Sequence, residues 1–376
     1  MMSKSPASKN NARVARTRRT GPSSSVIERL EPRQLLALAA GFESVKITRV
    51  VTDVATSMEF APDTGDGVTR LFVADSNNRK IVLLKNGVIQ STAALTFTTS
   101  EVDRARERGI ESILFDPNFV DNKFVYLYYT KPDPAKPEVT PSNAATRLVR
   151  YTMNAGNDTI NKSSAVVLLD NMPNPNGIHN GGAMRFGPDG MLYLAVGDGG
   201  IATESQNLDR FGGKVLRLNV DNPAQLAPTD NPFYNASNGI GARDYIWAYG
   251  FRNPFTGNFK PGSSTLYIND VGGSQWEEIN NVQKGKNYGW SNAEGMSSNT
   301  AYANPVYTYT HFPNGPGTTR VPASITGGAF YDGGQFPASY NGKYFFGDQV
   351  RKFIKVFDPA TGQATDFHTN DDANLD

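Results

Sequence analysis

A histidine and an aspartate lie where the two strands of a hairpin would bring them together. His179 stands in the segment NPNGIHNGG, and Asp198 ends the strand that follows the turn at residues 188–190. Antiparallel strands of about eight residues on each side of that turn would return Asp198 to His179. A carboxylate that orients an imidazole and stabilises its protonated form produces a general base. The pair therefore indicates proton-transfer chemistry, with a purely structural loop histidine as the alternative.

A second polar pair, Arg252 and Asn253, precedes Pro254 in the segment AYGFRNPF. The proline favours an extended backbone before it. A guanidinium beside an amide suits a planar ligand that carries carbonyl or carboxylate oxygens. The alternative is an arginine whose stem packs on Trp247 or Phe255.

Oxygen ligands for a cation gather in the segment NDVGGSQWEE. Gly272 and Gly273 leave backbone carbonyls accessible, and Glu277 and Glu278 add carboxylates nearby. Ca²⁺ prefers such mixed oxygen donors, but the spacing is not that of an EF-hand loop. On spacing alone, the segment is a weak calcium signal.

Strands must position these residues, because five segments repeat one β pattern. Each segment has a short run rich in β-branched and aromatic residues, a turn, and a second alternating run. A repeated sheet unit without helical periodicity is typical of a β-propeller. We expect an all-β, six-bladed β-propeller whose sixth blade combines N-terminal strands from residue 46 with a missing C-terminal hairpin, so that the last blade is incomplete. The aromatic anchors of the five segments are Phe72, Tyr126, Tyr193, Tyr267 and Phe345.

Aspartates recur at the ends of these strands, which two packed β-sandwiches would not explain. In a propeller such acids would surround one mouth. Aspartate also favours strand ends because its side chain bonds the nearby backbone. We expect most of the four to stabilise turns and one or two to act in a site. They are Asp75, Asp198, Asp270 and Asp348.

The composition excludes several classes of function. The 376 residues include 37 Lys and Arg, 36 Asp and Glu, three His and no Cys. Disulfides, thiolate nucleophiles and cysteine-bound metals are therefore excluded, and a multi-histidine metal centre would need nearly every histidine. The near-neutral charge gives no case for a nucleic-acid partner. No apolar run is long enough to span a membrane.

The N-terminal region differs in composition from the remainder. Residues 1–25 are basic, serine-rich and free of aromatics, which is typical of a disordered tail. Residues 30–36 resemble the Leu-Glu-Pro-Arg-x-Leu-Leu leader of large exported bacterial proteins. We predict a leader over 1–42, a propeller domain over 43–376, and export to the periplasm, cell surface or medium.

From about residue 44 to 358 the chain resembles the soluble glucose/sorbosone dehydrogenase family. The motifs ERGIESILFDPNF, HNGGAMRFGPDG, AYGFRNPF, NDVGGSQWEE and ITGGAFYDGG occur in order. Members are six-bladed propellers that oxidise aldoses with pyrroloquinoline quinone (PQQ) and Ca²⁺. The resemblance therefore implies these two cofactors, a sugar substrate and an electron acceptor, and a homodimer is compatible with it.

The resemblance also implies a role for each matching residue. His179 matches the base that takes the proton from the anomeric hydroxyl, Asp198 its orienting carboxylate, and Arg252 the residue that polarises the reacting quinone carbonyl. The other matches are Asn253, Glu107 and Gln349 for contacts to PQQ, Gly272 and Gly273 for its Ca²⁺, and Glu278 and Tyr288 for a second, structural Ca²⁺.

The chain departs from the family in the residues that clamp PQQ. Gln349 stands where members have a lysine that pairs with PQQ carboxylates, so Arg351 or Lys352 would have to substitute. The family's further arginines are missing from the next segment, and fewer cations weaken the binding of a tricarboxylate. The leading prediction is PQQ-dependent oxidation of an aldose at C1 to the lactone. The alternatives are a non-catalytic carbohydrate- or protein-binding propeller of a larger exported protein and a Ca²⁺-dependent lactone hydrolase.

Overall fold

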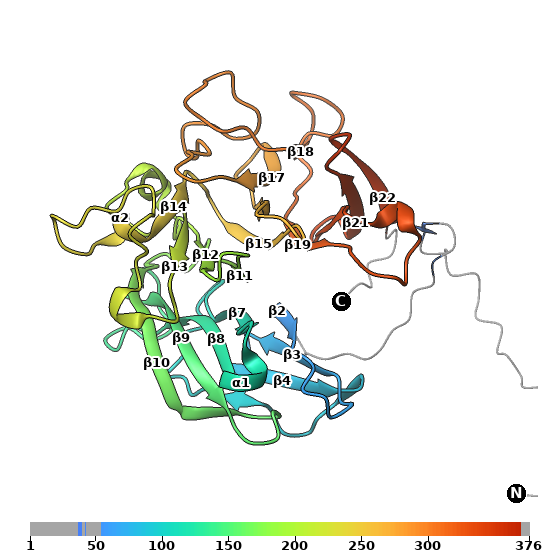
Figure 1. Cartoon of the computed structure of the whole chain (residues 1–376). Coiled ribbons are helices and arrows are strands. Elements are labelled where there is room, and N and C mark those ends of the chain that lie inside the picture. Colours follow the sequence, from blue (N-terminus) through green and yellow to red (C-terminus); the bar gives the residue numbers. More distant parts are fainter. Residues whose placement is uncertain (1–36, 40–41, 43–53, 370–376) are drawn as a thin grey trace, which may run out of the picture. The chain divides into compact units, whose positions relative to one another are not determined.

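Five antiparallel sheets make up the described part of the chain (Figure 1). The computed structural model describes residues 37–39, 42 and 54–369, all within one compact unit, Leu36–Asp376. In each sheet, β6 apart, strands that are consecutive in the chain are neighbours. The innermost strands contact one another in the order β2, β7, β11, β15, β19, and in Figure 1 they lie toward a common centre.

The first three sheets follow one another along the chain. The first sheet has β2 (Ala55–Phe60), β3 (Arg70–Asp75), β4 (Lys80–Lys85) and β5 (Val88–Ile89), with β6 (Leu95–Thr96) paired to β4. The second has β7 (Ile110–Phe115), β8 (Phe124–Lys131), β9 (Ala145–Met153) and β10 (Ile160–Pro173). The third has β11 (Gly181–Phe186), β12 (Leu192–Val196), β13 (Lys214–Leu218) and β14 (Ile246–Tyr249).

The last two sheets and the short helices complete the unit. The fourth sheet has β15 (Pro254–Phe259), β16 (Leu266–Asp270), β17 (Trp276–Val282) and β18 (Tyr307–Thr310). The fifth has β19 (Ile325–Phe330), β20 (Tyr344–Asp348), β21 (Phe353–Asp358) and β22 (Gln363–Thr369), with β1 (Ala37–Leu38) paired to β22. The helices are α1 (Phe119–Asn122), α2 (Ala242–Tyr245) and single 3₁₀ turns at Ala202–Gln206, Pro223–Gln225 and Ala338–Tyr340.

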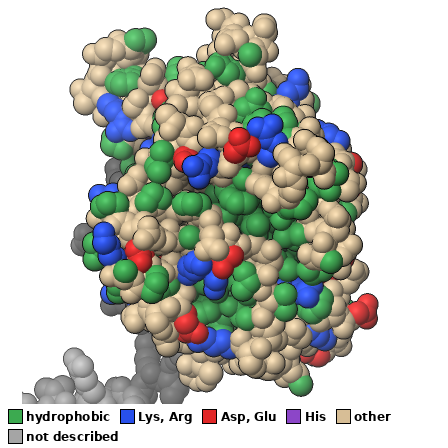
Figure 2. Space-filling view, turned by 90° about the vertical axis from the view of Figure 1, so that its left-hand side faces the viewer, with side chains coloured by type: hydrophobic (Ala, Val, Ile, Leu, Met, Phe, Trp, Pro, Cys, Tyr) green, Lys and Arg blue, Asp and Glu red, His purple; other side chains and the backbone are tan. Residues whose placement is uncertain are grey.

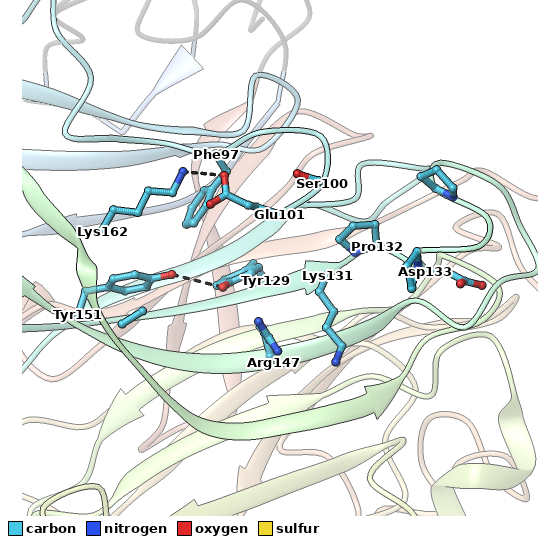
Figure 3. Close-up of a pocket in the computed structure, with 13 residues that line it drawn as sticks. Phe97, Ser100, Glu101, Tyr129, Lys131, Pro132, Asp133, Arg147, Tyr151 and Lys162 are labelled. Atoms are coloured by element: carbon cyan, nitrogen blue, oxygen red, sulfur yellow. Dashed lines mark hydrogen bonds and ion pairs between the residues drawn. The ribbon is translucent and has the colours of Figure 1, made fainter.

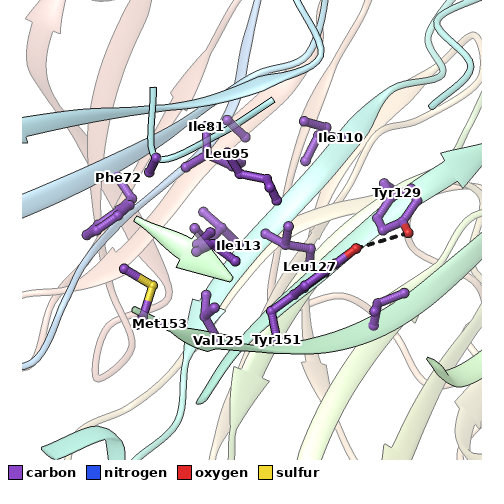
Figure 4. Close-up of a cluster of buried hydrophobic side chains, with 14 of the residues drawn as sticks. Phe72, Ile81, Leu95, Ile110, Ile113, Val125, Leu127, Tyr129, Tyr151 and Met153 are labelled. Atoms are coloured by element: carbon purple, nitrogen blue, oxygen red, sulfur yellow. Dashed lines mark hydrogen bonds between the residues drawn. The ribbon is translucent and has the colours of Figure 1, made fainter. Parts of the chain in front are cut away.

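The predicted repeat unit is confirmed, because each aromatic anchor lies on the second strand of its sheet, on β3, β8, β12, β16 or β20. The hydrophobic core lies between neighbouring sheets. Between the first two, Phe72 and Ile81 pack with Ile113, Val125 and Leu127, and all five side chains are fully buried (Figure 4). Packing sheet against sheet in this way is how a propeller covers both faces of each blade.

Truncating one of these core side chains should destabilise the whole unit. Leu127→Ala removes a fully buried side chain of β8 and is expected to lower the free energy of unfolding by about 2–5 kcal/mol. Val88→Ala is the control, because Val88 is 64% exposed on β5. The free energy of unfolding of Val88→Ala, measured by urea unfolding, is expected to fall by less than about 0.5 kcal/mol. Equal losses in the two variants would contradict this description of the core.

The prediction of six blades is wrong for the described residues, which form five sheets. The sixth blade depended on strands from residue 46, but residues 43–53 lie outside the described residues, and β2 is the inner strand of the first sheet. The last described blade is not incomplete either. The polar stretch after β21 forms β22, since strands pair through their backbone groups and do not need an apolar run.

Charges are mixed on the face that carries α2 and β14. In Figure 2, Lys and Arg side chains lie beside Asp and Glu in small groups, with hydrophobic side chains between them. Alternating signs over such short distances give this face no extended field of one sign. Among the residues that the structure describes, no helix is long and apolar enough to cross a membrane.

Candidate active site

His179 and Asp198 meet beside the inner end of the third sheet. His179 lies in the loop between β10 and β11, and Asp198 follows β12. The distance from His179 Nδ1 to Asp198 Oδ1 is 2.6 Å. Because an ionised carboxylate only accepts hydrogen bonds, Nδ1 carries the hydrogen and Nε2 keeps its lone pair. The hairpin therefore brings the two residues together as predicted, in the tautomer that a general base requires.

Two further donors hold Asp198 in place. The N–H of Gly200 donates to Oδ1 at 2.7 Å, and the indole N–H of Trp290 donates to Oδ2 at 2.8 Å. The side chain of Asp198 is only 1% exposed, so these protein groups rather than bulk water orient it. Trp290 was not predicted, because nothing in the local sequence links it to a residue 92 positions away.

Arg252 faces His179 from the other side. Its Nη2 lies 2.7 Å from His179 Nε2, and its Nη1 donates to the carbonyl of Val271 at 2.9 Å. The guanidinium also lies over the ring of Trp290, 5.7 Å from the ring centre. These contacts favour a site residue over an arginine that only packs its stem on a neighbouring aromatic.

Buried Asp270 fixes the backbone that carries Arg252 and Asn253. Its two oxygens accept the N–H groups of these residues at 2.9 and 2.6 Å. Burial raises the pKa of Asp270 well above its ordinary value and the charge of Glu278 acts in the same direction, while the two N–H donors oppose the shift. Asn253 in turn accepts the N–H of Gly181 at 2.9 Å. Asp270 thereby couples the fourth sheet to the loop of His179.

The four strand-end aspartates divide into two groups. Asp75 accepts hydrogen bonds from Asn78 in the turn that follows, and Asp348 accepts the N–H groups of residues 350 and 351. Asp198 and Asp270 instead hold side chains or backbone of the site. Two of the four thus stabilise their own turns through aspartate turn chemistry, rather than the majority that was predicted, and two hold groups of the candidate site.

A cavity of about 430 Å³ opens in front of His179. Glu107 reaches its edge, where Oε2 accepts the N–H of His179 at 2.8 Å. Gln349 lines the cavity from the end of the fifth sheet. Asp198 lies behind His179 and does not line the cavity. The predicted residues that line the cavity are His179, Arg252, Asn253, Glu107, Gln349, Gly272 and Gly273.

The expected substitutes for the clamp lysine do not line the cavity. Arg351 donates to the backbone carbonyls of Thr310 and Val321 at 2.9 and 2.8 Å. Lys352 is not among the lining residues, whereas Arg320 is. Arg320 was not predicted, because it stands alone in a glycine- and threonine-rich segment that carries no motif.

Glu111 on β7 is a second lining residue that sequence reasoning missed. Its side chain is buried, and Oε1 has no hydrogen-bond partner among the described residues. Burial and the charge of Glu107 raise the pKa of Glu111 well above its ordinary value. The one signal available was a charged residue within an apolar strand, IESILF, since carboxylates are rarely buried without a partner.

The side chains predicted to bind the structural Ca²⁺ are engaged by other protein groups. Glu278 accepts the N–H of Gly295 at 2.6 Å and the amide of Asn280 at 3.0 Å. The hydroxyl of Tyr288 donates to the carbonyl of Asn281 at 2.5 Å. Burial raises the pKa of Glu278 to about 7, with the neighbouring acids acting in the same direction. Glu278 and Tyr288 therefore do not present two free oxygens to one cation.

The Gly272-Gly273 loop is likewise held by side chains. Four successive N–H groups, of residues 273–276, donate to Oε1 of Glu294 at 2.9–3.0 Å. The carbonyl of Gly273 accepts a hydrogen bond from Arg320. Within the described part of the chain, no three acidic or histidine side chains are grouped to share a metal ion. This donor set does not fit the two predicted calcium sites.

A separate cavity of about 660 Å³ lies beside β8 and β9 (Figure 3). Its three basic side chains are already paired, Lys162 with Glu101 at 2.6 Å, and Arg147 and Lys131 with Asp170 at 2.5 and 3.1 Å. None of the residues around His179 lines it. The predicted site residues that line a cavity therefore lie in the cavity of His179.

The fold and the site define a β-propeller whose central cavity presents a histidine between a carboxylate and an arginine. The model of the glucose/sorbosone dehydrogenase family matches residues 52–370. The chain belongs to this family, and the predicted resemblance is confirmed.

Relatives of known name include both enzymes and other proteins. The chain is 30% identical to the aldose sugar dehydrogenase of Escherichia coli, over 66% of this chain and 64% of the relative. It is 31% identical to quinoprotein glucose dehydrogenase B of Acinetobacter calcoaceticus, over 55% and 44%. It is 29% identical to the human hedgehog-interacting protein, over 78% and 41%. The chain thus spans less than two thirds of the length of these relatives.

Solved structures share the fold. The soluble aldose sugar dehydrogenase of Escherichia coli in its apo form superimposes with a TM-score of 0.68 at 23% identity, over 84% of this chain and 86% of that one. The PQQ-bound form of the aldose sugar dehydrogenase of Streptomyces coelicolor gives a TM-score of 0.62 at 23% identity, over 84% and 80%. At this identity the likeness concerns the propeller architecture.

Proposed function

We propose that the chain oxidises an aldose at C1 to the lactone, with His179 as the general base. The observation that carries the proposal is the alignment of Asp198, His179 and Arg252 at a cavity in a family of sugar dehydrogenases. The anomeric O–H bond breaks and its proton passes to His179 Nε2. The C1–H bond breaks with its electron pair, which leaves as hydride, and the C1–O bond becomes a carbonyl. PQQ supplies the two-electron acceptor chemistry when bound.

The chain's own residues prepare this proton transfer. Asp198 accepts from Nδ1–H and would stabilise the imidazolium that forms. Nε2 accepts a hydrogen bond from Arg252 in the structure, so the sugar hydroxyl must take that position before it can transfer its proton. The guanidinium keeps its hydrogen bond to the carbonyl of Val271 and so stays beside the reacting atoms, where its positive charge would stabilise negative charge that develops on the acceptor.

The lining of the cavity suits a planar polycarboxylate such as PQQ. Arg252 and Arg320 supply guanidinium donors, and Asn253 and Gln349 supply amides. Charge-assisted hydrogen bonds to carboxylates are the strong contacts that such an anion requires. The PQQ-bound relative from Streptomyces coelicolor supports this choice of cofactor. Ca²⁺ was predicted as a second cofactor, but its donor set does not fit, and no step here uses it.

Reconstitution tests the proposal. The purified chain is incubated with PQQ, with and without Ca²⁺, and with an artificial electron acceptor, and a panel of aldoses is screened for dye reduction. We expect aldose-dependent reduction and a rise in the thermal midpoint on adding PQQ. Absence of both would contradict the proposal.

Gly197 gives a second prediction, because the loop of His179 passes directly over it. A Cβ on Gly197 would collide with the backbone carbonyl oxygen of His179. Gly197→Ala is expected to shift His179 and lower kcat/KM at least about tenfold, since small misplacements at a reacting centre are costly. Gly334→Ala is the control, because no atom lies within 4 Å of its added Cβ. Equal kcat/KM in the two variants would argue against this close approach.

A second candidate function is non-catalytic binding of a protein or carbohydrate as a module of a larger protein. It is favoured by the hedgehog-interacting proteins of human and mouse, which match 78% and 79% of this chain. PQQ that co-purifies or binds tightly would refute this alternative, whereas partner binding that survives His179→Ala without any PQQ binding would support it. The third alternative, a lactone hydrolase, needs several side chains on one metal, and no contact among the described residues favours it.

We further propose that the chain is exported from the cytoplasm. The predicted leader over 1–42 lies almost entirely outside the described residues, and the boundary at residue 43 stays a prediction. An exported chain would meet its sugar outside the cytoplasm, and its electron acceptor and any homodimer are further proposals. Fractionation of cells that express the full chain tests export.

A further inference from the structure

A second histidine beside the cavity is held between a carboxylate and an arginine. His311 Nε2 lies 2.7 Å from Glu277 Oε1, and His311 Nδ1 lies 2.9 Å from Arg320 Nη2. The side chains of His311 and Glu277 are 1% and 0% exposed, whereas Arg320 is exposed and lines the cavity. The order carboxylate, imidazole, guanidinium repeats that of the site around His179. Buried groups therefore orient Arg320 from behind.

Glu277 holds this arrangement in place through hydrogen bonds to several elements. Its second oxygen, Oε2, accepts the N–H of Ile325 at 2.9 Å and that of Gly272 at 3.4 Å. The same carboxylate thus contacts β19, the glycine loop and His311. A buried carboxylate with partners on several elements is fixed in one orientation, and it passes that restraint to the imidazole and to Arg320.

Arg320 contacts the backbone oxygens of the loop to which calcium was assigned. Its Nη2 donates to the carbonyl of Gly273 at 3.3 Å, and its Nε donates to that of Ser274 at 3.4 Å. A cation bound to the same Gly273 carbonyl would lie close to the guanidinium, where two positive charges repel. Nη1 of Arg320 has no hydrogen-bond partner among the described residues, so both of its N–H donors are available to a ligand.

We propose that Arg320 supplies the positive charge that the family resemblance assigns to Ca²⁺, and that its Nη1 binds an oxygen of the anionic cofactor. The proposal rests on the proposed function, because it takes PQQ as the ligand. Arg320 acts together with Arg252, and the buried His311 and Glu277 act as positioning residues behind it. Binding of PQQ to this chain is then independent of Ca²⁺.

Binding of PQQ to the full chain in the presence of a calcium chelator is the first test. The unmodified chain should bind PQQ in the chelator, and added Ca²⁺ should not tighten binding. Arg320→Gln should weaken it about 10- to 100-fold, as expected for a lost hydrogen bond to a charged group. Arg243→Gln is the control, since it removes the same charge from an exposed side chain on α2 that pairs with Asp209. An absolute need for Ca²⁺, or unchanged affinity in Arg320→Gln, would overturn the proposal.

Cation binding without PQQ is the second test, and it separates this proposal from the proposed function. The ring of Trp290 lies against Gly273, so Trp290 can sensitise the luminescence of Tb³⁺, a substitute for Ca²⁺. Removing the guanidinium removes charge repulsion, so Arg320→Ala should bind Tb³⁺ at least about tenfold more tightly than the unmodified chain and Arg243→Ala. Equal affinities would overturn the proposal. If PQQ fails to bind both in the presence of Ca²⁺ and in the presence of the chelator, the proposed function fails, and the Tb³⁺ result still decides the role of Arg320.

Discussion

His179→Gln is expected to lower kcat/KM for aldose oxidation by about 10²- to 10⁴-fold, the usual contribution of a general base. Glutamine can still accept the hydrogen bond from Arg252, but it cannot take up the proton of the anomeric hydroxyl. PQQ binding should remain, because the guanidinium and amide donors of the cavity are unchanged. Steady-state kinetics with saturating PQQ and an artificial acceptor provide the measurement.

A matched histidine outside the cavity provides the control for this substitution. His368 is buried on β22 and does not line the cavity. His368→Gln should retain kcat/KM, even if its thermal midpoint falls. Loss of activity of the same size in both variants, or full activity in His179→Gln, would show that His179 is not the base.

Asp198→Asn is expected to lower kcat by about 10²- to 10⁴-fold, because the histidine loses its fixed tautomer and the stabilisation of its protonated form. Asp198 accepts from His179 Nδ1, Gly200 N–H and the indole of Trp290. An asparagine must turn its NH₂ either toward the indole of Trp290, which makes one contact unfavourable, or toward His179 and Gly200, which makes two unfavourable. In both orientations the negative charge that stabilises the imidazolium is lost. The pH profile of kcat/KM should change shape together with the rate.

The control for Asp198→Asn is the equivalent residue of another sheet. Asp75 also ends the second strand of its sheet, but its carboxylate contacts Asn78 in the following turn and Lys80 rather than a histidine. Asp75→Asn should leave both the rate and the pH profile unchanged. A pH profile that is the same in Asp198→Asn and the unmodified chain would mean that Asp198 supports the fold rather than His179.

The repeat of anchors made the sheet architecture predictable, but it did not give the number of blades. Each anchor marks a strand that must be covered on both faces, and this requirement is local to its own segment. The sixth blade had no anchor and was inferred from the room left in the chain. The strand β22 was missed for a related reason, because a polar strand gives little periodic signal.

The site was predictable where its geometry is local. His179 and Asp198 belong to one hairpin, so strand length and turn position predict their meeting. Arg252 reaches His179 across 73 positions, and its role came from the family resemblance rather than from spacing. Trp290 and Arg320 carry no motif, and only the folded arrangement of sheets brings them to the cavity.

Calcium was predicted from oxygen donors that the fold has already paired with other protein groups. The sequence indicates that oxygen donors lie around Gly272 and Glu278, but it does not indicate which groups those oxygens already bind. In the fold, Glu294 accepts hydrogen bonds from the N–H groups of the loop, and Glu278 accepts the N–H of Gly295. Arg320 donates to the carbonyl of Gly273. Competition among protein partners for the same oxygen depends on long-range packing, which spacing does not report.

The central claim is that His179 removes the hydroxyl proton while hydride leaves C1. The most direct test is the kinetic isotope effect of an aldose deuterated at C1, measured in single turnovers of the PQQ-loaded chain and of His179→Gln. We predict a primary isotope effect in the unmodified chain, and a turnover rate lowered by orders of magnitude in the variant with PQQ still bound. Full PQQ occupancy without any oxidation of C1, or oxidation at the same rate in both proteins, would contradict the account.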